Sequence, residues 1–356
     1  MSSSRRDFLK ASAVALAAGR VAQAEPRRQL NEDWIKRENE REGASDWQLT
    51  RVRPEGYNNP NIEGYCSRQS VKAGESIDVA VSTAPAAQFT IEIFRMGYYG
   101  GRGARSMKTL GPFKGKQQPK PPVGEKRLRR CRWDPAVSLT IPHDWPSGVY
   151  LGRLTTLPDK ANTPYWQSYV IFIVRDDRPA DFLFQCSDNT WQAYNRWPDN
   201  FSLYTDPRGS HALDVAVSFD RPYAKYSQIF ERPLSTGSGE FLLWEYPLAY
   251  WMEKHGYDVT YCSNSDCLDA EQITRCNTFI SVGHDEYWDV LQYHAVKKAI
   301  GAGTNAMWLC GNSVFAVSPF SEARRVITRD GIYSGLTDDE IIESIDVFTK
   351  DWRRRG

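Results

Sequence analysis

The chain has 356 residues, of which 41% are hydrophobic and 13% aromatic, so it is long enough to bury a large core and to form two domains. Its formal net charge is +1, which excludes a global field that would attract nucleic acid or an anionic membrane. Twelve Trp and eighteen Tyr form an aromatic surplus that suits either a ligand groove or a thick sandwich core.

Residues 1–24 have the pattern of a twin-arginine signal peptide. Arg5 and Arg6 begin the signature, an Ala-rich apolar stretch follows, and residues 22–24 read Ala-Gln-Ala. The apolar stretch is too short and too rich in Ala to remain as a spanning helix, so we expect no stable membrane anchor. The sequence therefore predicts a periplasmic protein that is exported already folded, so that a cofactor or metal can be loaded in the cytoplasm.

Three segments are expected to lie outside regular strands. Residues 25–55 are polar and charged, and they predict an extended arm anchored by Trp34 and Trp47. Residues 114–132 are rich in Pro, Lys and Arg without interleaved aromatics, which favours a solvated loop over a basic binding patch. Residues 97–105 contain four glycines and predict a structural bulge or a docking contact onto a second domain.

Residues 56–178 are expected to form an all-β domain. Apolar residues alternate with polar ones over 70–81 and again over 89–94, as in strands with one buried face. Further strands are expected over 147–154 and 169–174, the last being almost continuously apolar. Short strands at this spacing, separated by Gly and Pro turns, favour a β-sandwich of the immunoglobulin type.

The pattern changes at residue 179, and residues 179–335 predict an α/β domain. Strands then alternate with helices, which is typical of an open parallel sheet covered by helices. The expected strands cover 181–186, 258–262, 277–282 and 305–310, and the expected helices cover 246–255 and 289–300. Residues 336–356 form a charged C-terminal tail.

Polar side chains follow three of these strands. Tyr194 comes after the first strand, His284 and Glu286 after the third, and Asn312 after the fourth. Ligands bind at the carboxyl ends of strands in open α/β sheets, so these loops predict a site on one rim. The alternative for the segment at 283–288 is a capped helix start, in which the two acids complement the helix dipole.

Seven cysteines are too few for a disulfide scaffold, and their number is odd. Cys262, Cys267 and Cys276 lie near His255 and raise a zinc hypothesis, but the second Cys-x-x-Cys pair is missing. A disulfide formed after export, or simply buried thiols, explains these residues better.

Several motifs resemble the large subunit of N,N-dimethylformamidase and its relatives, in the same order and from about residue 60 to about residue 335. The motifs are Gly-Tyr-Cys-Ser at 64–67, Ser-Val-Lys-Ala-Gly-Glu at 70–75, Ile-Phe-Arg-Met-Gly-Tyr-Tyr-Gly-Gly-Arg-Gly-Ala-Arg at 93–105, Asn-Thr-Trp-Gln-Ala-Tyr-Asn at 189–195, Ser-Leu-Tyr at 202–204, Gly-His-Asp-Glu-Tyr-Trp at 283–288 and Gly-Asn at 311–312.

That family hydrolyses an N-alkylated formamide to formate and an amine, using one iron held by two tyrosines and a glutamate. Aligned by motif, the resemblance implies Tyr194, Tyr204 and Glu286 as ligands of a mononuclear iron, Fe(III). Phenolate and carboxylate oxygens suit such a hard Lewis acid. The implied reaction is hydrolysis of a small N-substituted amide by metal-activated water.

The resemblance also implies catalytic roles for His284 and Asn312. His284 would act as general acid/base or hold the attacking water, and Asn312 would donate a hydrogen bond to the developing oxyanion. Tyr223 and Tyr226 replace the two tyrosine ligands if the variable loop aligns differently.

The expected fold class is α/β plus β, with an N-terminal immunoglobulin-like β-sandwich followed by an open parallel-sheet α/β domain of the glutamine-amidotransferase-like kind. The expected partners are the small amide and a small subunit, as in the family enzyme, or a homo-oligomer, and no nucleic acid. The family continues well beyond residue 340, and its later part lines the pocket. If that later part closes the site, a chain without it would bind metal but lack turnover.

Two other functions fit the residues. Cys310 ends a strand and would serve as the nucleophile of a thiol hydrolase or amidotransferase-like site, activated by His284. The flanking glycine pattern of a nucleophile elbow is absent around Cys310. A non-catalytic exported protein that binds sugar or cell wall would use the sandwich and the many tryptophans.

Overall fold

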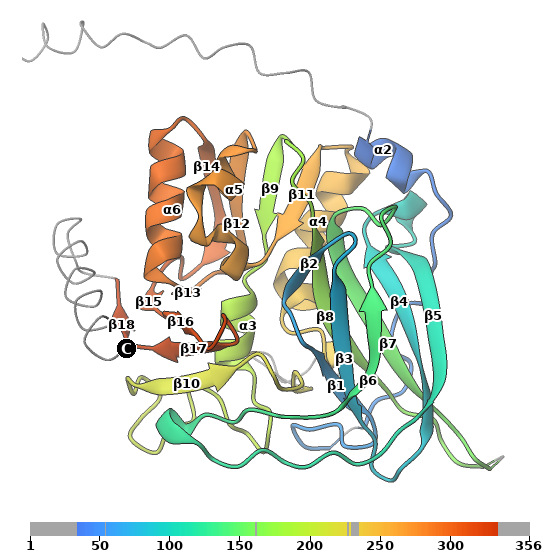
Figure 1. Cartoon of the computed structure of the whole chain (residues 1–356). Coiled ribbons are helices and arrows are strands. Elements are labelled where there is room, and N and C mark those ends of the chain that lie inside the picture. The colour runs from blue at the N-terminus through green and yellow to red at the C-terminus, as the bar shows by residue number, and fades with distance from the viewer. Residues whose placement is uncertain (1–33, 54, 161, 226–227, 229–234, 334–356) are drawn as a thin grey trace, which may run out of the picture. The chain divides into compact units, whose positions relative to one another are not determined.

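The structure is a computed structural model that describes residues 34–333, except 54, 161, 226–227 and 229–234, and these residues belong to one compact unit. The predicted signal peptide and the charged tail lie outside the described residues. No helix in the described ranges is both long and apolar enough to cross a membrane. The expected α/β plus β content is confirmed (Figure 1).

Residues 63–175, here called the two-sheet region, form two β-sheets around one core. One sheet has the order β1-β3-β6 and the other β2-β8-β7-β4-β5. Alternate residues of β3 and β4 are buried between the sheets, so the predicted alternation is confirmed. The strands are β1 (Glu63–Cys66), β2 (Ser70–Lys72), β3 (Ser76–Ser82), β4 (Gln88–Met96), β5 (Ala104–Lys114), β6 (Pro135–Thr140), β7 (Gly148–Leu157) and β8 (Gln167–Arg175).

Four parallel strands, in the order β11-β9-β12-β14, form the second major sheet. All four predicted strands and both predicted helices of this region are confirmed. The elements are β9 (Phe182–Gln185), α3 (Asp188–Tyr194), α4 (Tyr246–Lys254), β11 (Val259–Cys262), α5 (Ala270–Thr274), β12 (Thr278–His284), α6 (Val290–Gly301) and β14 (Asn305–Gly311). Pro247 lies in the first turn of α4, and Gly256, with a φ of 72°, follows its end.

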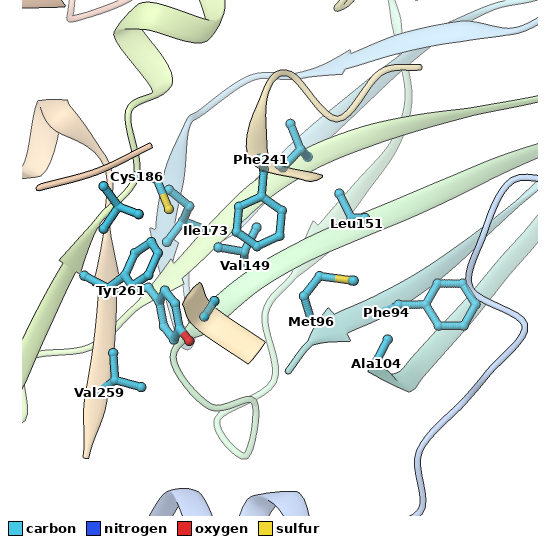
Figure 2. Close-up of a cluster of buried hydrophobic side chains, with 14 of the residues drawn as sticks. Phe94, Met96, Ala104, Val149, Leu151, Ile173, Cys186, Phe241, Val259 and Tyr261 are labelled. Atoms are coloured by element: carbon cyan, nitrogen blue, oxygen red, sulfur yellow. The ribbon is translucent and has the colours of Figure 1, made fainter. Parts of the chain in front are cut away.

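The parallel sheet is covered on both faces. One face packs against α5 and α6, as Leu183 and Phe279 share a core with Val296. The opposite face packs against α4 and against the two-sheet region. Figure 2 shows this second core, where Cys186 and Tyr261 lie near Val149 and Ile173. Burial of these apolar side chains joins the two sheet systems without a separating solvent layer.

Two small sheets lie beyond the carboxyl end of β12. Their orders are β10-β17-β16 and β13-β15-β18. The sequence did not predict them, because several of their strands have only two residues. The strands are β10 (Val215–Ser218), β13 (Tyr287–Trp288), β15 (Ala316–Val317), β16 (Phe320–Ser321), β17 (Val326–Arg329) and β18 (Gly331–Ile332).

One local prediction and one alternative from the sequence do not agree with the structure. The arm predicted as extended contains the helix α2 (Trp34–Asn39). The acids of the 283–288 segment do not cap α6, since β13 intervenes and Asp289 is the N-cap, accepting from the Leu291 backbone N–H.

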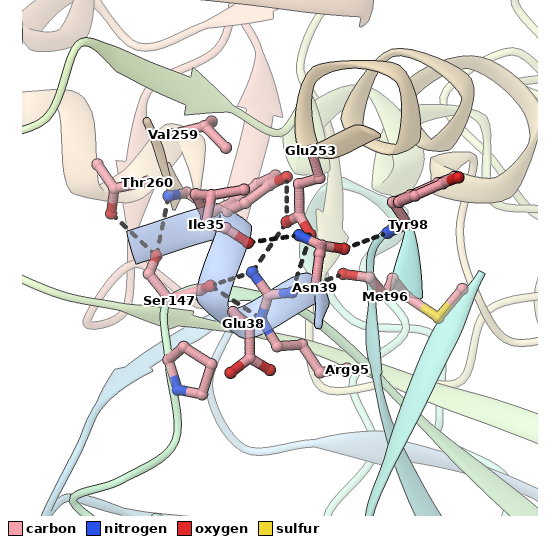
Figure 3. Close-up of polar contacts among 12 residues, drawn as sticks. Ile35, Glu38, Asn39, Arg95, Met96, Tyr98, Ser147, Glu253, Val259 and Thr260 are labelled. Atoms are coloured by element: carbon pink, nitrogen blue, oxygen red, sulfur yellow. Dashed lines mark hydrogen bonds and ion pairs between the residues drawn. The ribbon is translucent and has the colours of Figure 1, made fainter. Parts of the chain in front are cut away.

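A fully buried ion pair joins the two-sheet region to α4 (Figure 3). Arg95 on β4 donates to both carboxylate oxygens of Glu253, with nitrogen–oxygen distances of 2.8 and 3.1 Å. Asn39 of α2 also donates to Glu253, at 3.1 Å. Arg95 further donates to the Tyr99 hydroxyl at 2.7 Å, and that hydroxyl donates to Glu38 of α2. The pair therefore holds three distant parts of the chain together.

The glycine-rich segment at 97–105 makes the docking contact that the sequence predicted. The Tyr246 hydroxyl of α4 donates to the Gly103 carbonyl at 2.9 Å, and the rings of Tyr98 and Tyr250 pack edge to face. Gly103 has a φ of 91°, a conformation that disfavours any residue with a Cβ. This segment therefore rests on the same helix as the ion pair.

Removing one partner of the ion pair should be strongly destabilising. We expect Arg95→Met to lower the free energy of unfolding by about 3–5 kcal/mol, because Glu253 would remain buried without its cation. Denaturant unfolding followed by fluorescence measures this change. The double variant Arg95→Met/Glu253→Leu should recover part of the loss. A single variant as stable as the wild type would contradict the role assigned to the pair.

Candidate functional site

A buried carboxylate fixes the helix that carries Tyr194. Glu245 ends a π-helical turn, η4 (Phe241–Glu245), and is fully buried. One of its oxygens accepts the Ser187 backbone N–H at 3.1 Å and the Trp191 indole N–H at 2.7 Å. Ser187 is the N-cap of α3 and Trp191 lies in its middle, so Glu245 sets the position of this helix. Tyr194 is the last residue of α3.

Glu286 and two tyrosines meet beyond the end of β12. The Tyr194 hydroxyl donates to one carboxylate oxygen of Glu286 at 2.7 Å, and the Tyr204 hydroxyl donates to the other at 2.8 Å. The backbone N–H of Glu286 donates to the Thr190 hydroxyl at 3.0 Å, which ties the acid to α3. The structure thus brings together the three residues predicted as metal ligands.

The two tyrosine rings are stacked, with centroids 4.2 Å apart and planes inclined by 23°. Sequence reasoning missed two neighbours of this pair. The Tyr287 hydroxyl donates to the Tyr204 oxygen at 2.7 Å, and the buried guanidinium of Arg329 lies 5.2 Å from the Tyr204 ring centre. Tyr287 lies in the 283–288 motif, so the sequence could have indicated it as a neighbour of the site. Arg329 lies on strand β17, which was not predicted, and no sequence motif connects it with the site.

Burial raises the pKa of both tyrosines well above the usual value for a phenol. The Glu286 carboxylate raises the pKa of Tyr194 further, and the nearby Tyr287 and Glu286 do so for Tyr204. Without a bound cation, both phenols are therefore protonated at neutral pH and act as hydrogen-bond donors. The same protons would have to leave before either oxygen could bind a metal ion.

His284 lies beside the tyrosine–glutamate cluster. Its Nδ1 is 2.5 Å from the Gln228 amide nitrogen, and its Nε2 is 3.5 Å from a Glu286 oxygen. Burial lowers the pKa of His284, so the neutral imidazole is favoured. An amide N–H donated to Nδ1 leaves the ring proton on Nε2, directed toward Glu286. Gln228 was not predicted from the sequence.

Asn312 differs from the other predicted site residues because its side chain is exposed. It follows β14, is exposed and has a φ of 48°. Gly311, the preceding residue, pairs with His284 across the parallel sheet. Among the described residues, no side-chain hydrogen bond joins Asn312 to the cluster. The structure therefore brings Asn312 to the same rim but not into contact with the ligands.

Other predicted residues have different surroundings. Cys310 Sγ lies 3.0 Å from the Ser281 hydroxyl and 2.8 Å from that of Ser313, and burial raises the pKa of its thiol. Its contacts do not include His284, whose nitrogens face Gln228 and Glu286. Tyr223 packs its ring against Trp191 and is not hydrogen-bonded to Glu286. The other substitute, residue 226, lies outside the described residues.

The cysteines do not form a metal site. All seven are free, and Cys262 and Cys267 bring their sulfurs within 3.4 Å of each other. Within the described ranges, no group of three or more His, Cys, Asp or Glu side chains could hold a metal ion. The zinc hypothesis is therefore not supported, and a cation at the candidate site would depend on the phenol oxygens.

Comparison with known proteins gives one family match. The family described as "N,N-dimethylformamidase beta subunit-like, C-terminal" matches residues 90–356, which is most of the chain. No curated protein matches it. Among solved structures, a family 123 glycoside hydrolase from Clostridium perfringens matches with 8% identity and a TM-score of 0.15, over 36% of this chain and 28% of that one. A likeness this weak carries no argument.

The buried acid beneath α3 predicts a pH effect on stability. Burial raises the pKa of Glu245 to about 8, so folding favours its protonated form. Its stabilising contribution is complete below the unfolded pKa, near 4.5, and is lost as the pH rises toward 8. Relative to Glu245→Gln, which stays neutral, the wild type should lose up to about 1.4 kcal/mol of unfolding free energy per pH unit in this window.

Urea unfolding at several pH values between 4.5 and 8 measures this difference. Glu271→Gln, a change of an exposed acid on α5, is the matched control and should not alter the slope. Parallel pH profiles for the wild type and Glu245→Gln would contradict the assignment.

Proposed function

Because the chain belongs to the N,N-dimethylformamidase beta subunit-like family, we propose that it is an iron-dependent amidohydrolase that cleaves a small N-substituted amide. The family supports a dimethylformamidase-like hydrolase. The iron site, the substrate and the roles of individual residues are the finer parts of the proposal. The observation that carries them is the convergence of two phenol oxygens on the two oxygens of one buried carboxylate.

The donor set fits one hard cation. Tyr194, Tyr204 and Glu286 offer only oxygen, which suits Fe(III) rather than a soft metal. Their oxygens already lie within hydrogen-bond distance of one another, with phenol protons between them. Loss of these protons would leave three anionic oxygens facing one point. The buried Arg329 beside Tyr204 would offset part of that negative charge.

A bound iron would supply Lewis acidity, which activates water and polarises the amide carbonyl. The remaining steps belong to side chains around it. With Nδ1 accepting from the Gln228 amide and the ring proton on Nε2, neutral His284 would hold the attacking water by donating a hydrogen bond to it. The Gln228 amide holds the His284 ring through Nδ1 and keeps Nε2 facing the site. Asn312 would donate to the oxygen that becomes negative in the tetrahedral state.

The finer description of the fold and setting is part of the same proposal. We assign the two-sheet region to an immunoglobulin-like sandwich over 56–178, and the parallel sheet to a glutamine-amidotransferase-like domain over 179–335. Residues 1–24 would direct the protein to the periplasm by the twin-arginine route. The family name refers to a beta subunit, which supports association with another subunit.

Metal analysis tests the ligand assignment. We expect about one iron per chain and a visible tyrosinate-to-iron absorption band, since two phenolates would bind the ion. Tyr194→Phe should weaken or shift this band, and Glu286→Ala should abolish iron binding. Tyr223→Phe is the matched control, because that partly buried tyrosine is not hydrogen-bonded to Glu286, and it should keep both signals. Iron-free wild type, or loss of iron in Tyr223→Phe alone, would overturn the assignment.

Kinetics test Asn312 separately from metal binding. Asn312→Gly keeps the backbone conformation with positive φ and removes the side-chain donor. Formate release from N,N-dimethylformamide should fall roughly 100- to 1,000-fold in kcat, as for other lost oxyanion donors, with unchanged iron content. Asn200→Gly, at another asparagine with positive φ (66°), is the control and should leave kcat unchanged. Equal loss in both variants would reject a specific role for Asn312.

A further inference from the structure

Among the residues that the structure describes, strand β14 is an edge of the parallel sheet. The strand order β11-β9-β12-β14 pairs it with β12 on one side only (Figure 1). A strand at such an edge presents a row of backbone N–H and C=O groups to any approaching strand. Of the two edge strands of this sheet, β14 is the longer, with seven residues against four in β11.

The exposed residues of β14 are strongly apolar. Met307, Trp308 and Leu309 are 40%, 43% and 46% exposed, although they are consecutive and point to alternate faces of the sheet. On one face, Trp308 also contacts the buried rings of Phe279 and Trp288. Both faces of the strand therefore offer apolar surface next to unpaired backbone. An exposed patch of this kind marks an interaction surface.

Nothing in β14 protects it against pairing. Natural edge strands avoid association through charged residues, proline or a bulge. Residues 305–311 contain no charge and no proline, and their register with β12 is regular over all seven residues. A second neutral strand could therefore approach without electrostatic repulsion or a steric obstacle.

We propose that β14 pairs antiparallel with β14 of a second copy of this chain, around a twofold axis at Trp308. The sequence of the strand supports a self-pairing. With Trp308 opposite itself, Met307 faces Leu309, Ala306 faces Cys310 and Asn305 faces Gly311. Apolar residues meet apolar residues at the centre, and small or polar residues meet at the ends. The two four-stranded sheets become one sheet of eight strands.

The pairing would place the second copy beside the candidate site. Gly311 ends β14 opposite His284, and Asn312 follows it directly. A strand added outside β14 would run past Gly311 and cover the side of Asn312 that faces solvent. This interface does not depend on the iron or on the proposed reaction, so it is testable in metal-free protein.

Cysteine crosslinking tests the register. In a Cys310→Ser background, which removes the one cysteine that is not buried, Trp308→Cys should give a covalent dimer on mild oxidation. Facing Cβ atoms in such a pair lie about 4.5–5.5 Å apart, within disulfide range. Met307→Cys alone should crosslink poorly, but mixed with Leu309→Cys it should form the 307–309 pair. Crosslinking of all three variants with equal efficiency would overturn the register.

Light scattering at several protein concentrations tests the interface itself. Leu309→Lys should raise the dimer dissociation constant at least about 100-fold, since the twofold axis places the new charge in the interface twice. Leu213→Lys is the matched control, because Leu213 is 48% exposed on another surface, and it should remain dimeric. Circular dichroism confirms that both variants are folded. A wild type that is monomeric at tens of micromolar, or that associates only with a different polypeptide, would overturn the proposal.

Discussion

The arrangement of the molecule depends on the buried pair Arg95–Glu253. Neither charge reaches water, so each must be neutralised by the other and by surrounding hydrogen bonds. This requirement fixes β4 against α4. The π-helical turn before α4 ends at Glu245, which in turn holds the start of α3 through Ser187 and Trp191. Tyr194 lies at the other end of α3. Two sets of buried polar contacts, joined by α4 and α3, therefore connect the junction between the sheets to the candidate ligands.

In the tyrosine–glutamate cluster, as in the ion pair, each buried polar group is satisfied by a hydrogen bond with a neighbouring side chain. Both oxygens of Glu286 are occupied by phenols, and Tyr287 donates to the Tyr204 oxygen in turn. In a low-dielectric interior, such a connected network is stable only while each donor has an acceptor. The stacked rings of Tyr194 and Tyr204 bring their hydroxyls to one carboxylate although the two residues belong to different segments. The stacked rings and the shared carboxylate therefore restrict the positions of the two phenol oxygens before any ligand binds.

The sequence predicted the elements whose burial follows a local period. Alternation in β3 and β4, the apolar run of β12, and the Pro247 and Gly256 limits of α4 are local signals, and the structure agrees with them. The small sheets could not be predicted in the same way, because β13 and β15 are pairs of residues whose partners are distant in the chain. Composition and spacing alone gave no reason to join Tyr204 to Glu286. Family motifs supplied that pair, and no motif indicated Arg329.

The adjacent acids Asp285 and Glu286 differ in the donors that satisfy them. Asp285 accepts from the amide groups of Gln185 and Asn264 and from the Ser281 hydroxyl. Amide protons cannot leave, so a cation at Asp285 would strand buried donors without acceptors, at a cost of about 1–3 kcal/mol each. The hydrogen bonds to the Glu286 carboxylate come from two phenols, with His284 Nε2 at 3.5 Å beside them, and the phenol protons can be released. A cation that replaces them leaves no donor unsatisfied. Of the two carboxylates, Glu286 is therefore the better candidate for the proposed metal ligand.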